Sequence, residues 1–242
     1  MRDNKVKIFD TPLLAANELA LRLKEAINRK DEIFNLAISG GSTPKILFNI
    51  LASAEYSKSI KWENVHLWWC DERCVPPDDA DSNYGMTKEN LLDMVSIPQS
   101  NIHRIKGEAE PSKEAVRYAM DIEKILCEGK NCLPVFNWVL LGIGEDGHTA
   151  SLFPGKNLLF IYSNIVGVTQ HPVSGQKRIS LTKEVLNNAE KITFLVTGKG
   201  KAKILSEIIF GHPVSKNYPA AEIKPVNGTI DWMMDKDAAF YL

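Results

Sequence analysis

Short apolar runs alternate with longer amphipathic stretches along this chain. The apolar runs are rich in β-branched and aromatic residues, and most of them end at Gly, Ser or Asp, as buried strands do. They lie at Val6–Phe9, Ile33–Ser39, Val65–Cys70, Val135–Gly142, Ile165–Val168 and Ile192–Thr197. Because strands that alternate with helices are typical of βα units, we expect an α/β protein with an open, mainly parallel sheet flanked by helices on both faces.

The amphipathic stretches predict helices between these strands. In the first of them, Thr11 and Pro12 provide an N-cap and a first-turn residue. Helices are expected at Pro12–Lys30, Pro44–Ser53, Tyr84–Met94, Lys113–Cys127, Lys183–Asn188 and Lys199–Phe210. By contrast, Asp71–Asn83 holds two prolines and four aspartates without periodicity, so we expect a long loop there, directly after a strand.

Composition and charge narrow the class of protein. The chain has 242 residues, 44% of them hydrophobic, and no linker that would divide it, so residues 1–242 are expected to form one domain. A net charge of −1 provides no basic field for nucleic acid, so any anion must be bound by local groups. No secretory signal and no apolar stretch of about 20 residues is present, which favours a cytoplasmic protein outside the membrane.

The four cysteines occur in two pairs, spaced C-x3-C and C-x4-C. Neither pair has the partners of a zinc site, so we expect reduced thiols and no bound metal. These cysteines are Cys70, Cys74, Cys127 and Cys132.

A glycine-rich turn follows the second predicted strand. It reads Ser39-Gly40-Gly41-Ser42-Thr43-Pro44 and directly precedes a helical pattern. Its glycines let the backbone approach a ligand, Ser42 or Thr43 can cap the helix, and Pro44 suits the first turn, which aims amide groups at an anion. An ordinary capped helix start explains the same residues equally well. Without the Gly-Lys-Ser/Thr ending of a P-loop, ATP and GTP are disfavoured as ligands.

A second turn, Gly142–Thr149, follows the most hydrophobic predicted strand. It contains G-x-G-x-x-G, but Pro154 follows too soon for the long helix of a dinucleotide site, so no nucleotide cofactor is expected. His148 lies at the carboxyl end of a strand, where open α/β sheets bind ligands, and can act as a base at neutral pH. Asp146 can orient its imidazole. We assign structural roles to the other four histidines, His66, His103, His171 and His212.

Charged residues elsewhere leave two interpretations open. Asp71, Glu72 and Arg73 follow an apolar strand, and either begin a solvated loop or place Asp71 and Arg73 over the same crevice as His148. Arg178 and Lys201, considered alone, have the character of surface charges.

Together these segments resemble the glucosamine-6-phosphate isomerase/6-phosphogluconolactonase superfamily, and within it the 6-phosphogluconolactonases. The resemblance covers nearly the whole chain and implies the Rossmann-like fold of that superfamily. The histidine motif is its most specific part. The matching segments are S-G-G-S-T-P at 39–44, D-E-R at 71–73, S-N-Y-G at 82–85, the histidine motif at 142–155, R-I-S-L-T at 178–182 and T-G-K-G-K-A at 197–202.

Two positions separate the branches of this superfamily. The deaminases resemble the histidine motif but carry a glutamate where this chain has Phe153, and they typically read Asp-Glu-Tyr where it has Asp71-Glu72-Arg73. A phenylalanine cannot relay protons, and an arginine can bind an acyl oxygen or carboxylate as a cation. Both differences favour a lactone-hydrolysing carboxylic ester hydrolase.

The resemblance implies a role for each candidate residue. Gly41, Ser42 and Thr43 would bind the 6-phosphate of 6-phosphogluconolactone. Arg178 and Lys201 would supply positive charge, and Asp71 would also contact the substrate. His148 would deprotonate the attacking water, Asp146 would orient it, and Arg73 would stabilise the oxyanion, bind the ground state or pair with Asp71.

Two other functions remain as alternatives. One is an amino-sugar phosphate deaminase or isomerase, and the other is a regulator that binds sugar phosphates without catalysis. The expected partner is a small sugar-phosphate lactone, and the expected state is a monomer without cofactor. The segment 217–221, Asn-Tyr-Pro-Ala-Ala, resembles a family loop and receives no chemical role.

Overall fold

A seven-stranded parallel sheet forms the centre of the protein. The structure, a computed structural model, describes residues 5–127 and 132–242, and every neighbouring pair in this sheet is parallel. The strands follow the order β1 (Lys5–Phe9), β11 (Thr229–Asp235), β10 (Lys191–Val196), β6 (Trp138–Leu141), β2 (Phe34–Ile38), β3 (Val65–Trp69) and β5 (Ile102–His103). Five of the seven confirm the predicted apolar runs, whereas β5 and β11 were not predicted.

A second sheet of four antiparallel strands corrects two expectations. Its order is β4 (Asp71–Arg73), β9 (Lys177–Leu181), β8 (Val166–Gln170) and β7 (Phe160–Tyr162). The run at 165–168 therefore lies outside the main sheet, and the expected loop at 71–83 begins with a strand. Cys70 is the corner between the sheets, because its N–H donates to Ile38 while its carbonyl accepts from Leu181.

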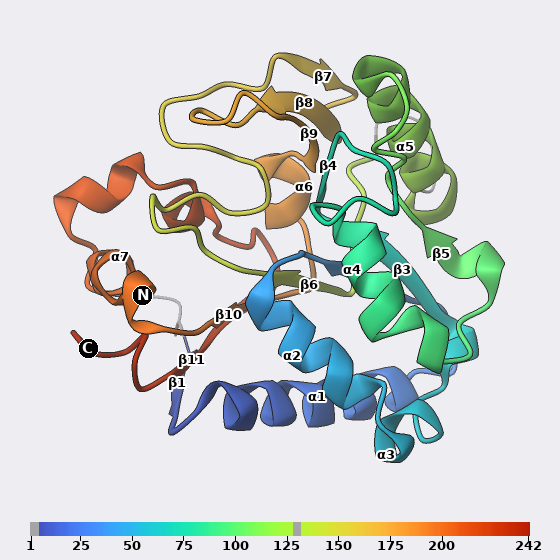
Figure 1. The fold of residues 1–242 in the computed structure, drawn as a ribbon, viewed down its shortest axis with the longest axis horizontal. Coiled ribbons are helices and arrows are strands. Elements are labelled where there is room, and N and C mark those ends of the chain that lie inside the picture. Colours follow the sequence, from blue (N-terminus) through green and yellow to red (C-terminus); the bar gives the residue numbers. More distant parts are fainter. Residues whose placement is uncertain (1–4, 128–131) are drawn as a thin grey trace.

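Helices pack on both faces of the main sheet, as predicted. Figure 1 shows α1 and α2 on one side of it and α5 with the four-stranded sheet on the other. The helices are α1 (Pro12–Arg29), α2 (Ser42–Leu51), α3 (Ala54–Ser57), α4 (Asn83–Asn90), α5 (Pro111–Leu126), α6 (Lys183–Asn187) and α7 (Ala202–Ile209). Thr11 caps α1 as expected, accepting from Leu14 N at 3.2 Å. None of the described helices is both long and apolar enough to cross a membrane.

The order in which the chain adds strands to the sheet reverses between β2 and β6. From β2 it continues outward through β3 to β5, and it then returns to the other side of β2 and adds β6, β10 and β11 in turn. Loops after two adjacent strands diverge at such a switch point, and the crevice between them is where open α/β sheets bind ligands. The two glycine-rich turns, 39–43 and 142–149, follow these two strands.

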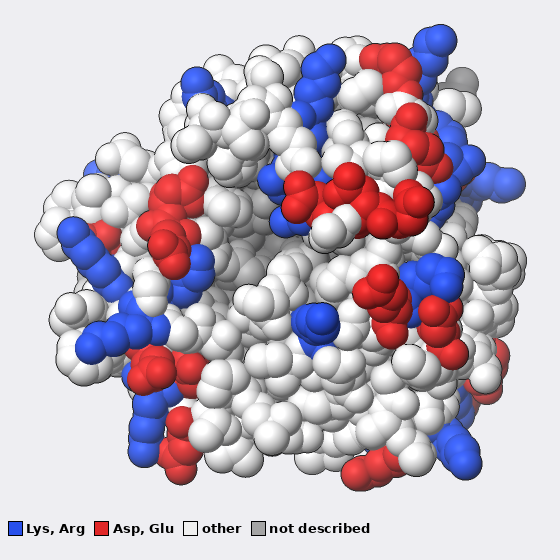
Figure 2. Space-filling view, in the orientation of Figure 1, with Lys and Arg blue, Asp and Glu red and all other residues white. Residues whose placement is uncertain are grey.

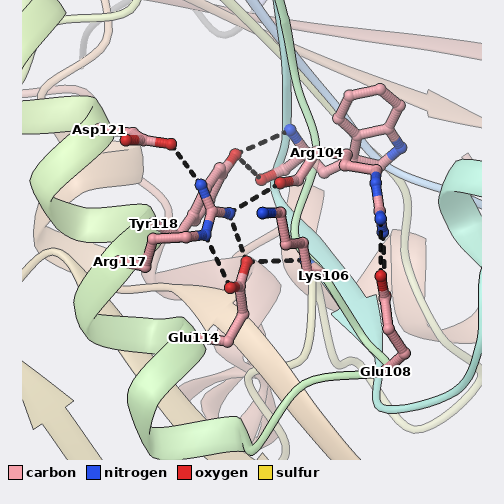
Figure 3. Close-up of polar contacts among 8 residues, drawn as sticks. Arg104, Lys106, Glu108, Glu114, Arg117, Tyr118 and Asp121 are labelled. Carbon is pink, nitrogen blue, oxygen red and sulfur yellow. Dashed lines mark hydrogen bonds and ion pairs between the residues drawn. The ribbon is translucent and has the colours of Figure 1, made fainter.

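Tyr118 of α5 fixes the end of β3 (Figure 3). The short strand β5 pairs with β3 only at Leu67 and Trp68, so it leaves Trp69 without a strand partner on that side. The buried Tyr118 hydroxyl donates to the Trp69 carbonyl and accepts from the Trp69 N–H, both at 2.9 Å. A side chain thus replaces the missing strand two residues before Asp71.

Arg117 holds the same helix against the segment after β5 (Figure 3). Its guanidinium bonds Asp121 and the buried Glu114, and it donates to the Arg104 carbonyl at 2.9 Å. Glu114 also accepts from Lys106 N at 2.7 Å. This network fixes α5, and with it Tyr118, relative to β3.

His66 and His103 confirm their structural assignment. His103 stacks on Trp68 with ring centroids 3.8 Å apart, and its Nε2 lies 3.0 Å from His66 Nδ1. Burial, together with the neighbouring His66 and Arg117, lowers the pKa of His103 to about 4. The folded protein therefore holds this ring uncharged under mildly acidic conditions.

We predict that His103→Phe flattens the dependence of stability on pH between about 4 and 6.5. In this pH range the wild-type His103 is protonated in the unfolded state but not in the folded state. The free energy of unfolding therefore falls as the pH drops through the range, by about 3 kcal/mol for one such histidine. The phenylalanine keeps the stacked ring and cannot titrate. Urea unfolding at several pH values measures the effect, with the exposed His212→Asn as control. An unchanged dependence in His103→Phe would contradict the prediction.

Candidate active site

One cavity of about 240 Å³ lies at the carboxyl ends of the central strands. Figure 2 shows the hollow near the centre of this face of the molecule. Its volume suits one small ligand rather than a dinucleotide. Of the nine predicted site residues, eight line it, and Asp146 lies directly behind His148. The eight are Gly41, Ser42, Thr43, Asp71, Arg73, His148, Arg178 and Lys201.

The amino end of α2 forms one wall of this cavity. The helix begins at Ser42, two residues before the predicted start, and its N-cap is Gly41 at φ 116°. Within the part of the chain that the structure describes, no side chain caps this helix, so the expectation that Ser42 or Thr43 does so is wrong. The Thr43 hydroxyl instead contacts that of Thr197 at the end of β10, at 2.7 Å. The first amides of a ten-residue helix are thus left for an anion.

His148 and Asp146 form a hydrogen-bonded pair. Asp146 Oδ1 lies 2.6 Å from His148 Nδ1 and accepts from His148 N at 3.1 Å. Burial raises the pKa of Asp146, but the contacts with His148 outweigh it and hold that pKa below its usual value. A carboxylate that accepts from Nδ1–H leaves Nε2 as the basic nitrogen. This geometry is that of an imidazole oriented as a base.

Phe153 packs against this histidine. Its buried ring lies 5.1 Å from the His148 ring, centroid to centroid. At the position where the deaminases of the superfamily are expected to carry a glutamate, this chain therefore places an apolar ring against His148.

Two arginines face one another across β4 and β9. Arg73 and Arg178 are directly opposed in the antiparallel register, and the Nε of each is buried without a hydrogen-bond partner among the described residues. Burial lowers the pKa of Arg178, as does the nearby Arg73. Arg73 also donates to the carbonyl of Asp81 at 2.5 Å. These opposed cations favour a bound anion, so the interpretation of Arg178 as a surface charge is wrong.

Lys201 is partly exposed to solvent, whereas Asp71 is buried. The Lys201 side chain is 25% exposed, and its Nζ lies 3.8 Å from Glu145. Asp71 is buried, and its Oδ2 accepts from the Ser151 hydroxyl at 2.6 Å. The side chain of Asn83 donates to the Asp71 carbonyl at 2.9 Å. No ion pair between Asp71 and Arg73 is present among the described residues, so that hypothesis receives no support.

Glu72 is a structural residue of the site that the sequence interpretation left without a role. Its buried carboxylate accepts from Arg73 N and Asn83 N at 2.8 Å, from Tyr84 N at 2.7 Å and from the Ser82 hydroxyl at 3.3 Å. Burial raises its pKa to about 7, against the opposing effect of the three amides. Glu72 thereby joins β4 to the start of α4, closing the loop between Arg73 and Asn83. Only its position beside Arg73 could have indicated this.

A larger cavity of about 1480 Å³ lies at the opposite edge of the sheet, at the amino ends of β6, β10 and β11. Arg22 and Lys191 in its lining both pair with the buried Asp231, at 3.4 and 3.6 Å. These charges are neutralised within the fold, and neither glycine-rich turn reaches this cavity. Eight of the nine candidate site residues therefore line the smaller cavity, and none of the nine lines the larger one.

The fold and the smaller cavity define an α/β protein with a crevice at the switch point, lined by a helix start, two opposed arginines and a histidine bonded to a carboxylate. Residues 13–232 match the family model described as glucosamine-6-phosphate isomerases/6-phosphogluconolactonase. The chain belongs to this family.

Individual relatives agree with this assignment. The chain is 46% identical over 205 residues to the 6-phosphogluconolactonase of Aggregatibacter actinomycetemcomitans, covering 85% of this chain and 86% of the relative. It is 47% identical over 204 residues to that of Haemophilus influenzae, covering 84% and 85%. A solved structure described as devB protein superposes with a TM-score of 0.92 at 44% identity and covers 99% of this chain and 100% of its own.

We predict that Glu72→Gln destabilises the protein by about 1–3 kcal/mol. An amide offers one acceptor oxygen in place of two, so at least one of the buried N–H groups of Arg73, Asn83 and Tyr84 loses its partner. Urea unfolding and amide hydrogen exchange measure the effect, with faster exchange expected at Asn83 and Tyr84. The exposed Glu63→Gln serves as control, and equal stability of both variants would refute the role assigned to Glu72.

Proposed function

We propose that this protein hydrolyses 6-phospho-D-glucono-1,5-lactone to 6-phospho-D-gluconate, the second step of the oxidative pentose phosphate pathway. One observation carries the proposal. The oriented imidazole of His148 shares a single small cavity with the start of α2 and with two opposed arginines, Arg73 and Arg178, whose buried Nε atoms have no hydrogen-bond partner among the described residues. A phosphorylated hexose lactone needs both kinds of group, and the named relatives are 6-phosphogluconolactonases.

The phosphate binds at the start of α2. Backbone amides and hydroxyls of Gly41, Ser42 and Thr43 face the anion, and the helix dipole favours its negative charge there. Arg178 and Lys201 supply positive charge, which the protein as a whole lacks at a net charge of −1. Asp71, held by Ser151, is left to accept from a sugar hydroxyl.

The lactone carbonyl lies near His148. Nε2 takes a proton from a water molecule while the water oxygen attacks C1, and Asp146 stabilises the imidazolium that forms. Arg73 stabilises the oxyanion of the tetrahedral intermediate. When the intermediate collapses, the bond between C1 and the ring oxygen breaks, and the imidazolium returns its proton to that oxygen. The product is a carboxylic acid, which releases its proton to solvent.

The same proposal includes a cytoplasmic, metal-independent monomer. The four cysteines are free thiols, as suits a reducing compartment. All the groups that the mechanism uses come from one chain, so catalysis requires no second subunit. The δ-lactone is an activated ester, and its hydrolysis needs no nucleophile beyond water.

A substrate comparison tests the reaction class. The purified protein is expected to hydrolyse 6-phosphogluconolactone, also in the presence of EDTA, and to leave glucosamine 6-phosphate unchanged, because Phe153 packs on His148 where a proton relay would need a carboxylate. Lactone loss is followed against its spontaneous hydrolysis. Turnover of the amino sugar alone would establish a deaminase, and binding of both without turnover would establish a regulator.

We expect His148→Ala to lower kcat at least about 100-fold, because a general base contributes about 10²–10⁴ to the rate. The dissociation constant for 6-phosphogluconate should change little, since the phosphate binds to other elements. Steady-state kinetics and calorimetry measure the two quantities. His212→Ala, in an exposed loop, is the matched control. Full activity in His148→Ala would exclude the proposed mechanism.

A further inference from the structure

The segment 217–221, which received no role from its sequence, packs against the turn that carries His148. Gly147 lies against the Tyr218 ring so closely that a Cβ at this glycine would come within 2.5 Å of the ring. In addition, Ala220 N donates to the Gly147 carbonyl at 3.1 Å. Gly147 has φ +85° and separates Asp146 from His148. One segment therefore holds both the carbonyl and the α-carbon of the central residue of the turn.

Tyr218 is itself fixed at both ends. Its hydroxyl donates to Glu207 Oε2 on α7 at 2.7 Å, and its backbone N–H donates to the Ser215 carbonyl at 2.9 Å. Gly200, two residues before α7 begins, contacts the residue that precedes Asp146. A Cβ built on Gly200 would come within 2.5 Å of Glu145 Oε1. The ring is thus held in place by α7 rather than by the turn it supports.

The turn needs such support because its reacting side chains are not packed in the core. The side chains of His148 and Asp146 are 32% and 45% exposed. Their 2.6 Å contact depends on the backbone angles of the three-residue turn, and Gly147 is the most permissive of the three. A rigid ring against Gly147 restricts those angles. Small displacements of a base have large effects on rate, about 100-fold for 1 Å.

We propose that Tyr218, anchored by Glu207, is a positioning residue that fixes the Asp146-Gly147-His148 turn for proton transfer. This inference rests on the proposed function. Tyr218 is not among the residues that line the cavity, and its ring lies against Gly147, so we expect its effect to pass through the turn that carries His148.

Tyr218→Ala tests the proposal. It is expected to lower kcat for 6-phosphogluconolactone about 10- to 100-fold, with KM and the dissociation constant for 6-phosphogluconate within about twofold of wild type. Tyr218→Phe keeps the ring and loses only the bond to Glu207, so it should recover most of the lost kcat. Glu207→Gln should behave like Tyr218→Phe. Tyr241→Ala, which truncates an exposed aromatic side chain elsewhere, is the matched control.

The double variant Tyr218→Ala/His148→Ala separates positioning from general destabilisation. If Tyr218 acts through His148, the second change adds little to the loss caused by His148→Ala. An equal further loss in that background, or wild-type kcat in Tyr218→Ala, would overturn the proposal. If Tyr218→Ala does not fold, Tyr218→Leu takes its place, because it removes the ring but keeps an apolar side chain, and wild-type kcat in Tyr218→Leu overturns the proposal. Failure of the wild type to hydrolyse the lactone, by contrast, refutes the proposed function itself.

Discussion

The divergence of the chain between β2 and β6 is the constraint on which the rest of the site depends. Because neighbouring parallel strands continue into helices and loops that depart in opposite directions, their carboxyl ends leave a crevice that no backbone fills. The turn at 39–43 enters it from one side and the turn at 142–149 from the other. The start of α2 and the imidazole of His148, oriented by Asp146, are thereby placed within one small cavity.

The second sheet adds what the parallel sheet cannot supply. At Cys70 the chain passes from β3 into β4, and the pairing of β4 with β9 opposes Arg73 and Arg178 beside the crevice. Placing two like charges together is unfavourable unless an anion joins them. Glu72 and Tyr118 stabilise this arrangement from outside the cavity, one by gathering amides of α4 and the other by completing the end of β3. Substrate binding would relieve the repulsion.

Strands such as β3 and β6 were predicted correctly because their residues are apolar almost throughout. β11 escaped detection because it carries Asp231 and Asp235, which are buried but bonded, the first to Arg22 and the second to Gly198 N. A pattern of hydrophobicity cannot recognise a polar residue whose partners come from elsewhere in the chain. β4 escaped for the same reason, since its three residues are all charged.

The sequence by itself determined the local features of the site, namely the glycine-rich turn that leads into a helix and the contact of Asp146 with His148 two residues later. Such features depend on neighbouring residues, whose relative positions a short stretch of backbone sets. Only the tertiary structure decided that Arg178 lies directly opposite Arg73 and that Tyr218 lies against Gly147. These placements follow from strand register and helix packing between distant segments, which bring together charges and rings that no local pattern relates.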